Sequence, residues 1–127
     1  MKRLFAILLV CAAVPAAAQT PPAKACLTQI NMWSFDAVPG NRSLIVTTRD
    51  HQRYRVNFQA PCYNLQWHLG LRFKTFGSSN LACIQRGDQV LMRDQAGPNF
   101  CMIQSVEYQT PALDKADADA KAAKAAH

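Results

Sequence analysis

The stretch SLIVTTRDHQRYRVNF, Ser43 to Phe58, decides the fold. Apolar and polar residues alternate on both sides of the short connection Asp50-His51-Gln52, which is typical of two strands joined by a tight turn. Because successive strand residues point to opposite faces, one set of side chains should be buried. That set is Leu44, Val46, Thr48, Tyr54, Val56 and Phe58. The stretch therefore predicts a β-hairpin with one buried face.

Short apolar segments separated by turn residues continue on both sides of this hairpin. No long 3.6-residue periodicity occurs before residue 110, so the pattern favours strands over helices. We expect these further strands at Gln29–Phe35, Leu69–Lys74, Leu81–Ile84, Gln89–Arg93 and Phe100–Tyr108. The pattern predicts one all-β domain over residues 26–110, folded as a small barrel or sandwich of six to seven short strands.

Residues 1–18 have the three parts of a cleavable secretory signal peptide. Lys2-Arg3 is a short positive region, Leu4–Val14 is an apolar run, and Ala16–Ala18 supplies the small residues that precede cleavage. The apolar run is shorter than the roughly 20 residues that a membrane-spanning helix needs. We therefore expect a periplasmic or secreted mature chain without a transmembrane span.

Cys11 raises an alternative location. Bacterial lipoproteins are cut just before a cysteine that then carries the lipid, but Val10 stands where a small residue is needed. Cleavage there would also shorten the apolar run. A lipid-anchored chain is the less favoured alternative.

Four of the five cysteines remain after removal of residues 1–18. An even number in an oxidising compartment favours two disulfides over free thiols, and three pairings are possible. The four are Cys26, Cys62, Cys83 and Cys101. No two of them have the C-x-x-C spacing of a zinc, redox or haem-attachment site, so we expect no metal and no cofactor.

The mature chain is moderately basic. Loss of Lys2-Arg3 lowers the basic residues from 14 to 12 against 8 acidic residues, so the net charge falls from +6 to +4. Most of this charge lies on predicted strands. If the strands that begin at Arg53 and Leu69 are neighbours, they form a basic patch for an anionic partner, composed of Arg53, Arg55, Arg72 and Lys74. The alternative is that these charges are solvated and oppose aggregation at sheet edges.

Other site chemistry has little support in the sequence. The aromatic residues Tyr54, Phe58 and Phe73 are predicted to face inward, so we expect no nucleic-acid partner. The histidines His51, His68 and His127 lack metal-binding spacing, and no serine has a nucleophile motif. Asp36 and Asp88 stand at turns, where a carboxylate commonly accepts backbone N–H bonds. We therefore do not expect an enzyme.

The order of features resembles a known family. The features are Cys26-Leu27, Ile30, Trp33, the strand at Leu44, Tyr54, Cys62 with Leu65, the segment Cys83–Asp88, and Cys101 with Ile103 and Val106. This order is similar to that of small exported proteins of Gram-negative bacteria grouped as domain-of-unknown-function family 6491, over about Cys26–Tyr108. The resemblance implies an envelope-facing domain with paired cysteines, and it implies no activity, substrate or catalytic residue.

The strand layout favours one pairing of the cysteines. Cys83 and Cys101 fall toward opposite ends of the sheet segment that they share, so they should not meet. This favours Cys26 with Cys83 and Cys62 with Cys101.

The two ends of the mature chain differ from the domain. Residues 19–25 form a flexible lead-in with two adjacent prolines. Residues 111–127 are rich in alanine, with three lysines and three aspartates, and predict a disordered or marginally helical tail. The sequence leaves the molecular function unknown. We expect a non-enzymatic domain that binds or supports an envelope component, and the alternative is a small protein inhibitor of an envelope hydrolase.

Overall fold

In the computed structural model, the expected hairpin is formed by β2 (Ser43–Thr48) and β3 (Arg53–Phe58). The structure describes residues 24–65, 70–77, 79–95 and 97–126. The two strands are antiparallel, with Val46 opposite Tyr54. Within the turn, the Thr48 hydroxyl donates to the Asp50 carboxylate. This hydrogen bond is the largest cause that lowers the pKa of the Asp50 carboxyl. The predicted signal peptide, with Cys11, lies outside the described residues.

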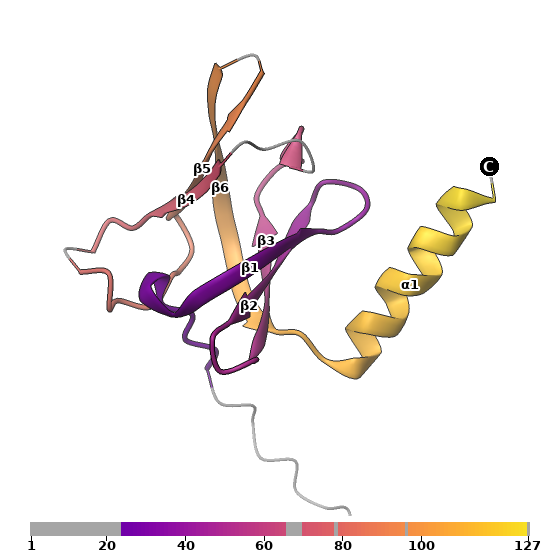
Figure 1. The fold of residues 1–127 in the computed structure, drawn as a ribbon, viewed down its shortest axis with the longest axis horizontal. Coiled ribbons are helices and arrows are strands. Elements are labelled where there is room, and N and C mark those ends of the chain that lie inside the picture. Colours follow the sequence, from indigo (N-terminus) through magenta and orange to yellow (C-terminus); the bar gives the residue numbers. More distant parts are fainter. Residues whose placement is uncertain (1–23, 66–69, 78, 96, 127) are drawn as a thin grey trace, which may run out of the picture.

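Four more strands extend the hairpin into one antiparallel sheet in the order β1-β2-β3-β6-β5-β4. They are β1 (Met32–Ala37), β4 (Gly70–Lys74), β5 (Gln89–Asp94) and β6 (Gly97–Tyr108). The sheet curls into a half-barrel, with α1 (Pro111–Ala125) outside it (Figure 1). The expected all-β fold with two disulfides is confirmed.

The inner face of the curled sheet carries the core. The inward residues predicted for the hairpin are all buried, and Tyr54, Phe58 and Phe73 are 8%, 4% and 5% exposed. The largest fully buried apolar side chains come from strands and loops alike: Leu27, Leu44, Val46, Val56, Leu65, Val90 and Ile103. Because the inner face is filled by side chains, functional groups must lie on the outer face or at the edges.

Contacts between the two edges of the half-barrel narrow its opening. The rings of Phe35 on β1 and Phe73 on β4 stack with their centroids 6.0 Å apart. Gln29 Nε2 donates to the Phe73 carbonyl at 2.8 Å, and the Ile84 N–H donates to the Leu27 carbonyl at 2.8 Å. The sheet edges are thus joined without a continuous ladder of backbone bonds between β1 and β4.

Two disulfides join distant segments, Cys26 with Cys83 and Cys62 with Cys101. This is the pairing that the strand layout favoured, and it is confirmed. The first bond lies beside the isolated bridge between Thr28 and Cys83. The second ties the segment after β3 to β6. Each disulfide therefore fixes a part of the chain that the sheet holds only weakly.

Some predicted strand limits were wrong. Residues 81–84 do not form a strand, because only Cys83 pairs there, with Thr28. The first strand begins at Met32, after a 3-10 turn, η1 (Gln29–Asn31). The last strand begins earlier than expected, at Gly97, because a tight turn pairs Gly97 with Asp94. In each case, backbone pairing sets the limit.

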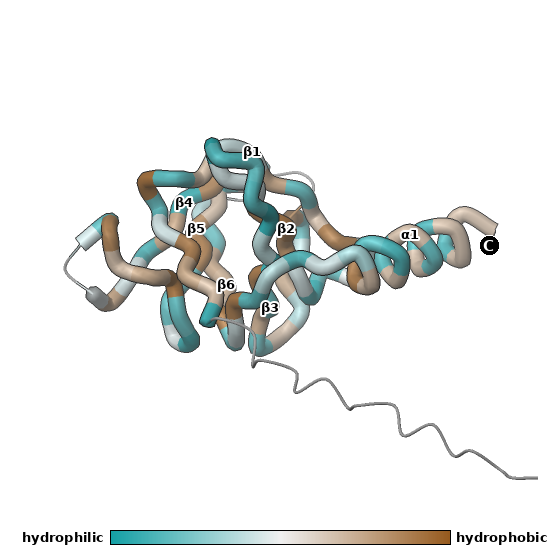
Figure 2. Tube along the Cα trace, turned by 90° about the horizontal axis from the view of Figure 1, so that it is seen from below, coloured by the Kyte–Doolittle hydropathy of each residue, from teal (hydrophilic) through white to brown (hydrophobic). Residues whose placement is uncertain are grey.

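Of the two alternatives for residues 111–127, the structure shows the helix. Thr110 caps it, since the Leu113 N–H donates to the Thr110 hydroxyl at 3.3 Å, and Pro111 occupies the first turn, where its missing N–H costs nothing. None of its described residues is buried. Figure 2 shows the helix projecting from the sheet, with hydrophilic and weakly apolar residues along it.

Candidate functional site

The outer face of the β4–β5 hairpin gathers three cations. Arg72 and Lys74 lie two residues apart on β4 and therefore share a face. Arg93 of β5 pairs with Gly70, so it lies on that same face. All three side chains are exposed. We call Arg72, Lys74 and Arg93 the basic face.

Apolar residues continue the basic face onto the next strand. Phe100 of β6 pairs with Leu91, and Leu91 pairs in turn with Arg72. Phe100 is 58% exposed. A row of cations beside an exposed aromatic ring is suited to a surface that is anionic outside and apolar beneath.

Two open hollows lie along the basic face. One of about 410 Å³ is lined by Gly70, Arg72, Leu91, Met92 and Arg93. The other, of about 450 Å³, lies beside it, and Arg72, Lys74 and Gln29 are among its lining residues. Both hollows are shallow, so they fit a headgroup or an extended partner better than an enclosed small molecule.

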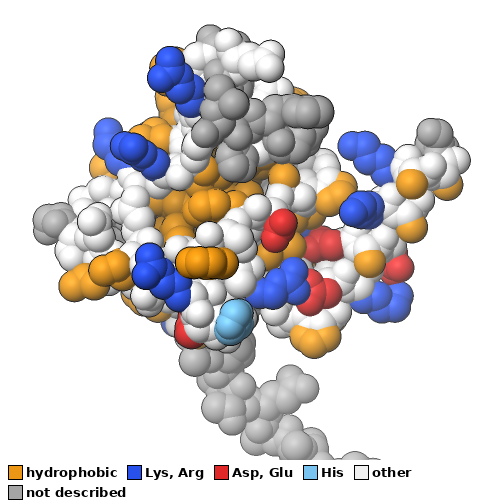
Figure 3. Space-filling view, viewed as in Figure 1, with side chains coloured by type: hydrophobic (Ala, Val, Ile, Leu, Met, Phe, Trp, Pro, Cys, Tyr) orange, Lys and Arg blue, Asp and Glu red, His pale blue; other side chains and the backbone are white. Residues whose placement is uncertain are grey.

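The charges of the basic face have no acidic neighbours among the residues paired with them. The register brings Gln89, Leu91, Pro98, Phe100 and Met102 beside the three cations. Among the side chains that the structure describes, which do not include that of Asp94, none forms an ion pair with the three cations. Figure 3 shows Lys and Arg side chains on the β4–β5 side without red side chains beside them, and mixed red and blue side chains near α1.

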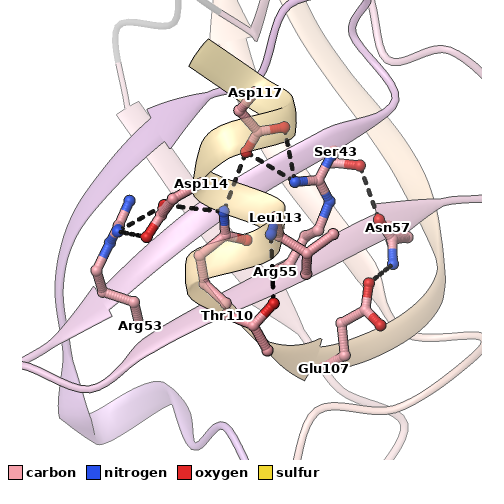
Figure 4. Close-up of polar contacts among 10 residues, drawn as sticks. Ser43, Arg53, Arg55, Asn57, Glu107, Thr110, Leu113, Asp114 and Asp117 are labelled. Carbon is pink, nitrogen blue, oxygen red and sulfur yellow. Dashed lines mark hydrogen bonds and ion pairs between the residues drawn. The ribbon is translucent and has the colours of Figure 1, made fainter. Parts of the chain in front are cut away.

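The other predicted cations, Arg53 and Arg55, are already paired within the molecule. Arg53 Nη1 donates to both carboxylate oxygens of Asp114, at 2.7 and 2.8 Å. Arg55 Nη1 donates to both carboxylate oxygens of Asp117, at 2.9 and 2.8 Å. The two aspartates lie three residues apart on α1 and reach the two arginines that lie two apart on β3 (Figure 4). We call Arg53 and Arg55 the arginine pair.

Gln109 connects the two ion pairs. Its side-chain Nε2 donates to Asp114 at 3.1 Å and to Asp117 at 3.0 Å. The hydrogen bond from Gln109 is the largest cause that lowers the pKa of the Asp114 carboxyl. Arg53 lowers this pKa further, against an opposite effect of desolvation. Three donors, from Arg53, Arg55 and Gln109, therefore hold the two carboxylates, and α1 is held to the sheet through them.

The sheet order keeps the two predicted pairs of cations apart. The patch of Arg53, Arg55, Arg72 and Lys74 required β3 and β4 to be neighbours, but β6 and β5 lie between them. The structure therefore brings Arg72 together with Lys74, and Arg53 together with Arg55, but it does not bring the four together. Arg93, which the sequence patch did not include, joins the first pair through the β4–β5 register.

Sequence reasoning also missed Asp114, Asp117 and Gln109. The available signal was the spacing of the charges, since two acidic residues at i and i+3 on a helix can face two basic residues at i and i+2 on a strand. The contact joins residues more than 60 positions apart, 61 for Arg53 with Asp114 and 62 for Arg55 with Asp117. The spacing alone does not show which strand the helix contacts.

Of the remaining polar candidates, Asp36 was expected at a turn but lies exposed on β1. Asp88 accepts the backbone N–H groups of Phe76 and Gln85, as expected for a turn aspartate. His51 is exposed in the β2–β3 turn, with φ of 64°, while His68 and His127 lie outside the described residues. In the described part of the chain, no three His, Cys, Asp or Glu side chains gather as a metal site.

Comparison with known proteins places the chain in a family without a known function. The model of a family of unknown function, DUF6491, matches residues 1–127, which is the whole chain. The chain belongs to the DUF6491 family. The resemblance stated from the sequence is therefore confirmed, and DUF6491 membership assigns no ligand or reaction. None of the curated proteins and none of the solved structures gives a significant match.

The structure also bears on the membrane and the compartment. None of the helices in the described ranges is apolar and long enough to cross a membrane. The two disulfides are consistent with an oxidising compartment. These findings leave the function to be argued from the basic face and the arginine pair.

Proposed function

We propose that this protein is a non-enzymatic periplasmic domain that binds the phosphate groups of envelope lipids through the basic face. The observation that carries the proposal is that Arg72, Lys74 and Arg93 lie on one exposed sheet face without an ion pair among the described residues. Unpaired cations attract an anionic surface, and this attraction is worth about 1 kcal/mol for each basic residue near the surface.

Phe100 adds an apolar contribution to this proposal. An exposed aromatic ring beside cations can enter the boundary between headgroups and acyl chains, where amphipathic surfaces bind. The shallow hollows beside Arg72 can accept headgroups without enclosing them. The periplasmic location in this proposal is supported by the two disulfides and by the signal-like residues 1–18.

Charge reversal on the basic face tests the proposal. The double variant Arg72→Glu and Lys74→Glu should bind vesicles of phosphatidylcholine with phosphatidylglycerol at least about 30-fold more weakly than the parent protein. Binding of the parent should fall steeply as salt rises. Co-sedimentation with the vesicles measures both effects.

The matched control has the same change in charge away from the basic face. Arg42 and Arg49 flank β2 and are exposed, so Arg42→Glu with Arg49→Glu alters the net charge equally. The control should retain most of the binding. Equal loss in both double variants, or no binding of the parent protein, would refute lipid binding through the basic face.

A further inference from the structure

The attachment of α1 to the sheet rests on charge and scarcely on burial. None of its described residues is buried, and among the described residues its side-chain hydrogen bonds to the sheet are made by Asp114 and Asp117, near its start. The distal part of the helix projects away from the strands (Figures 1 and 2). A helix of this length without a packed apolar face is marginal in water, so its attachment is easily reversed.

The contact between α1 and the sheet is also imperfectly packed. A hollow of about 240 Å³ lies between them, with Ile45 and Arg53 on the sheet side and Asp117 and Ala118 on the helix side. At the base of the helix, Gln109 is only 9% exposed, yet its Oε1 has no hydrogen-bond partner among the described residues. A buried carbonyl oxygen without a partner is unfavourable. The docked arrangement therefore leaves both space and an unsatisfied polar atom beside the arginine pair.

We infer that the arginine pair is an anion-binding site that α1 covers as an internal competitor. The carboxylates of Asp114 and Asp117 stand in for two phosphate groups of a ligand, since each engages a guanidinium through two oxygens, as phosphate does. A ligand with two adjacent phosphates displaces the helix, which then swings away from β3 at the Gln109-Thr110 connection. This site is separate from the basic face and does not depend on the proposed function.

Exposure of the ion pairs makes this competition possible. The Arg53 and Asp114 side chains are 40% and 42% exposed, so solvent weakens the attraction between them. The Arg55 and Asp117 side chains are 14% and 18% exposed and form the stronger ion pair. The helix has the advantage of a high effective concentration, because it is tethered beside its site. Removal of its two carboxylates should therefore increase ligand binding.

The test compares full-length variants in their binding of inorganic pyrophosphate, measured by calorimetry. Asp114→Asn with Asp117→Asn should bind about tenfold more tightly than the parent protein, because both internal competitors are neutralised. The control Asp36→Asn with Asp119→Asn makes the same change in net charge but leaves both arginine contacts intact, so it should bind like the parent. The same variants are also compared in their binding to vesicles of phosphatidylcholine with phosphatidylglycerol. This comparison shows whether lipid phosphates reach the site as free pyrophosphate does.

Two results would overturn the inference. One is that Asp114→Asn with Asp117→Asn increases the affinity for pyrophosphate or for vesicles no more than the control does. The other is that the gain survives when Arg53→Gln and Arg55→Gln are added, since the site would then lie elsewhere. Addition of Arg72→Glu and Lys74→Glu should leave the gain in pyrophosphate binding unchanged, so failure of the basic face as a lipid site leaves this inference intact.

Discussion

Asp88 shows how one side chain fixes a turn in this protein. Asp88 is 2% exposed, and its carboxylate accepts hydrogen bonds from the backbone N–H groups of Phe76 and Gln85, at 3.0 and 2.9 Å. Asp88→Ala leaves both donors without a partner, and each such loss costs about 1–3 kcal/mol. We expect the free energy of unfolding, measured by urea denaturation, to fall by about 2–6 kcal/mol. Asp36, which is exposed on β1, should when changed to Ala alter it by less than about 0.5 kcal/mol. Similar losses for both variants would contradict this role of Asp88.

At the scale of residues, strand alternation predicted the buried set of the hairpin but failed at Ile45. The pattern placed Ile45 on the outer face, and its register opposite Arg55 agrees. Ile45 is nevertheless only 7% exposed, because Val38, Pro39 and α1 lie around the hollow that it lines and shield it from solvent. Alternation identifies which residues share a face, but it contains no information about a helix that covers the second face.

At the scale of elements, docking of α1 should depend on pH through Asp114. The pKa of this carboxyl is lowered from 3.8 in the folded protein, chiefly by the hydrogen bond from Gln109 and next by Arg53. A lowered folded pKa means that the ionised carboxylate stabilises docking above about pH 4, and that this stabilisation is lost as the pH falls through the folded pKa. As the pH falls from about 4 through the lowered folded pKa, the helix should detach, and the circular dichroism at 222 nm should lose its helical part.

Asp114→Asn provides the comparison for that titration. An amide cannot ionise, so the variant should show weak helical signal near neutral pH and a much smaller change on acidification. Retention of the near-ultraviolet signal of the sheet would show that the core stays folded. Identical acid titrations of the parent and the variant would rule out Asp114 as the titrating group.

The sequence contained local signals for α1 but not for its partner. Thr110-Pro111 marks a helix start, and alanine-rich sequence favours helix. Stability in water, however, requires contacts beyond the helix, and here they come from β3, about 60 residues earlier. For the same reason, the strands joined by short turns were predicted well, whereas the segment Leu81–Ile84 was not.

At the scale of the whole molecule, the sheet order determines which cations can act together. Antiparallel neighbours such as β2 with β3 follow from short connections, but the pairing of β3 with β6 joins residues far apart in the chain. That pairing inserts β6 and β5 between the arginine pair and the basic face. The molecule therefore presents two separate cationic sites, one open on β4–β5 and one covered by α1.

The disulfides should differ in what their removal costs. Cys26–Cys83 spans 57 residues and Cys62–Cys101 spans 39. The lower entropy of the cross-linked unfolded chain alone stabilises the fold by about 4 kcal/mol for each disulfide, and slightly more for the longer loop. The burial of Cys62 should reverse this order of stabilisation. Cys62 is fully buried in the core, whereas Cys26 and Cys83 are exposed. Cys62→Ala with Cys101→Ala also leaves a small cavity, which adds about 1 kcal/mol. We expect this variant to unfold at the lower urea concentration, and the opposite order would show that the Cys26–Cys83 bond contributes more by joining the edges of the half-barrel.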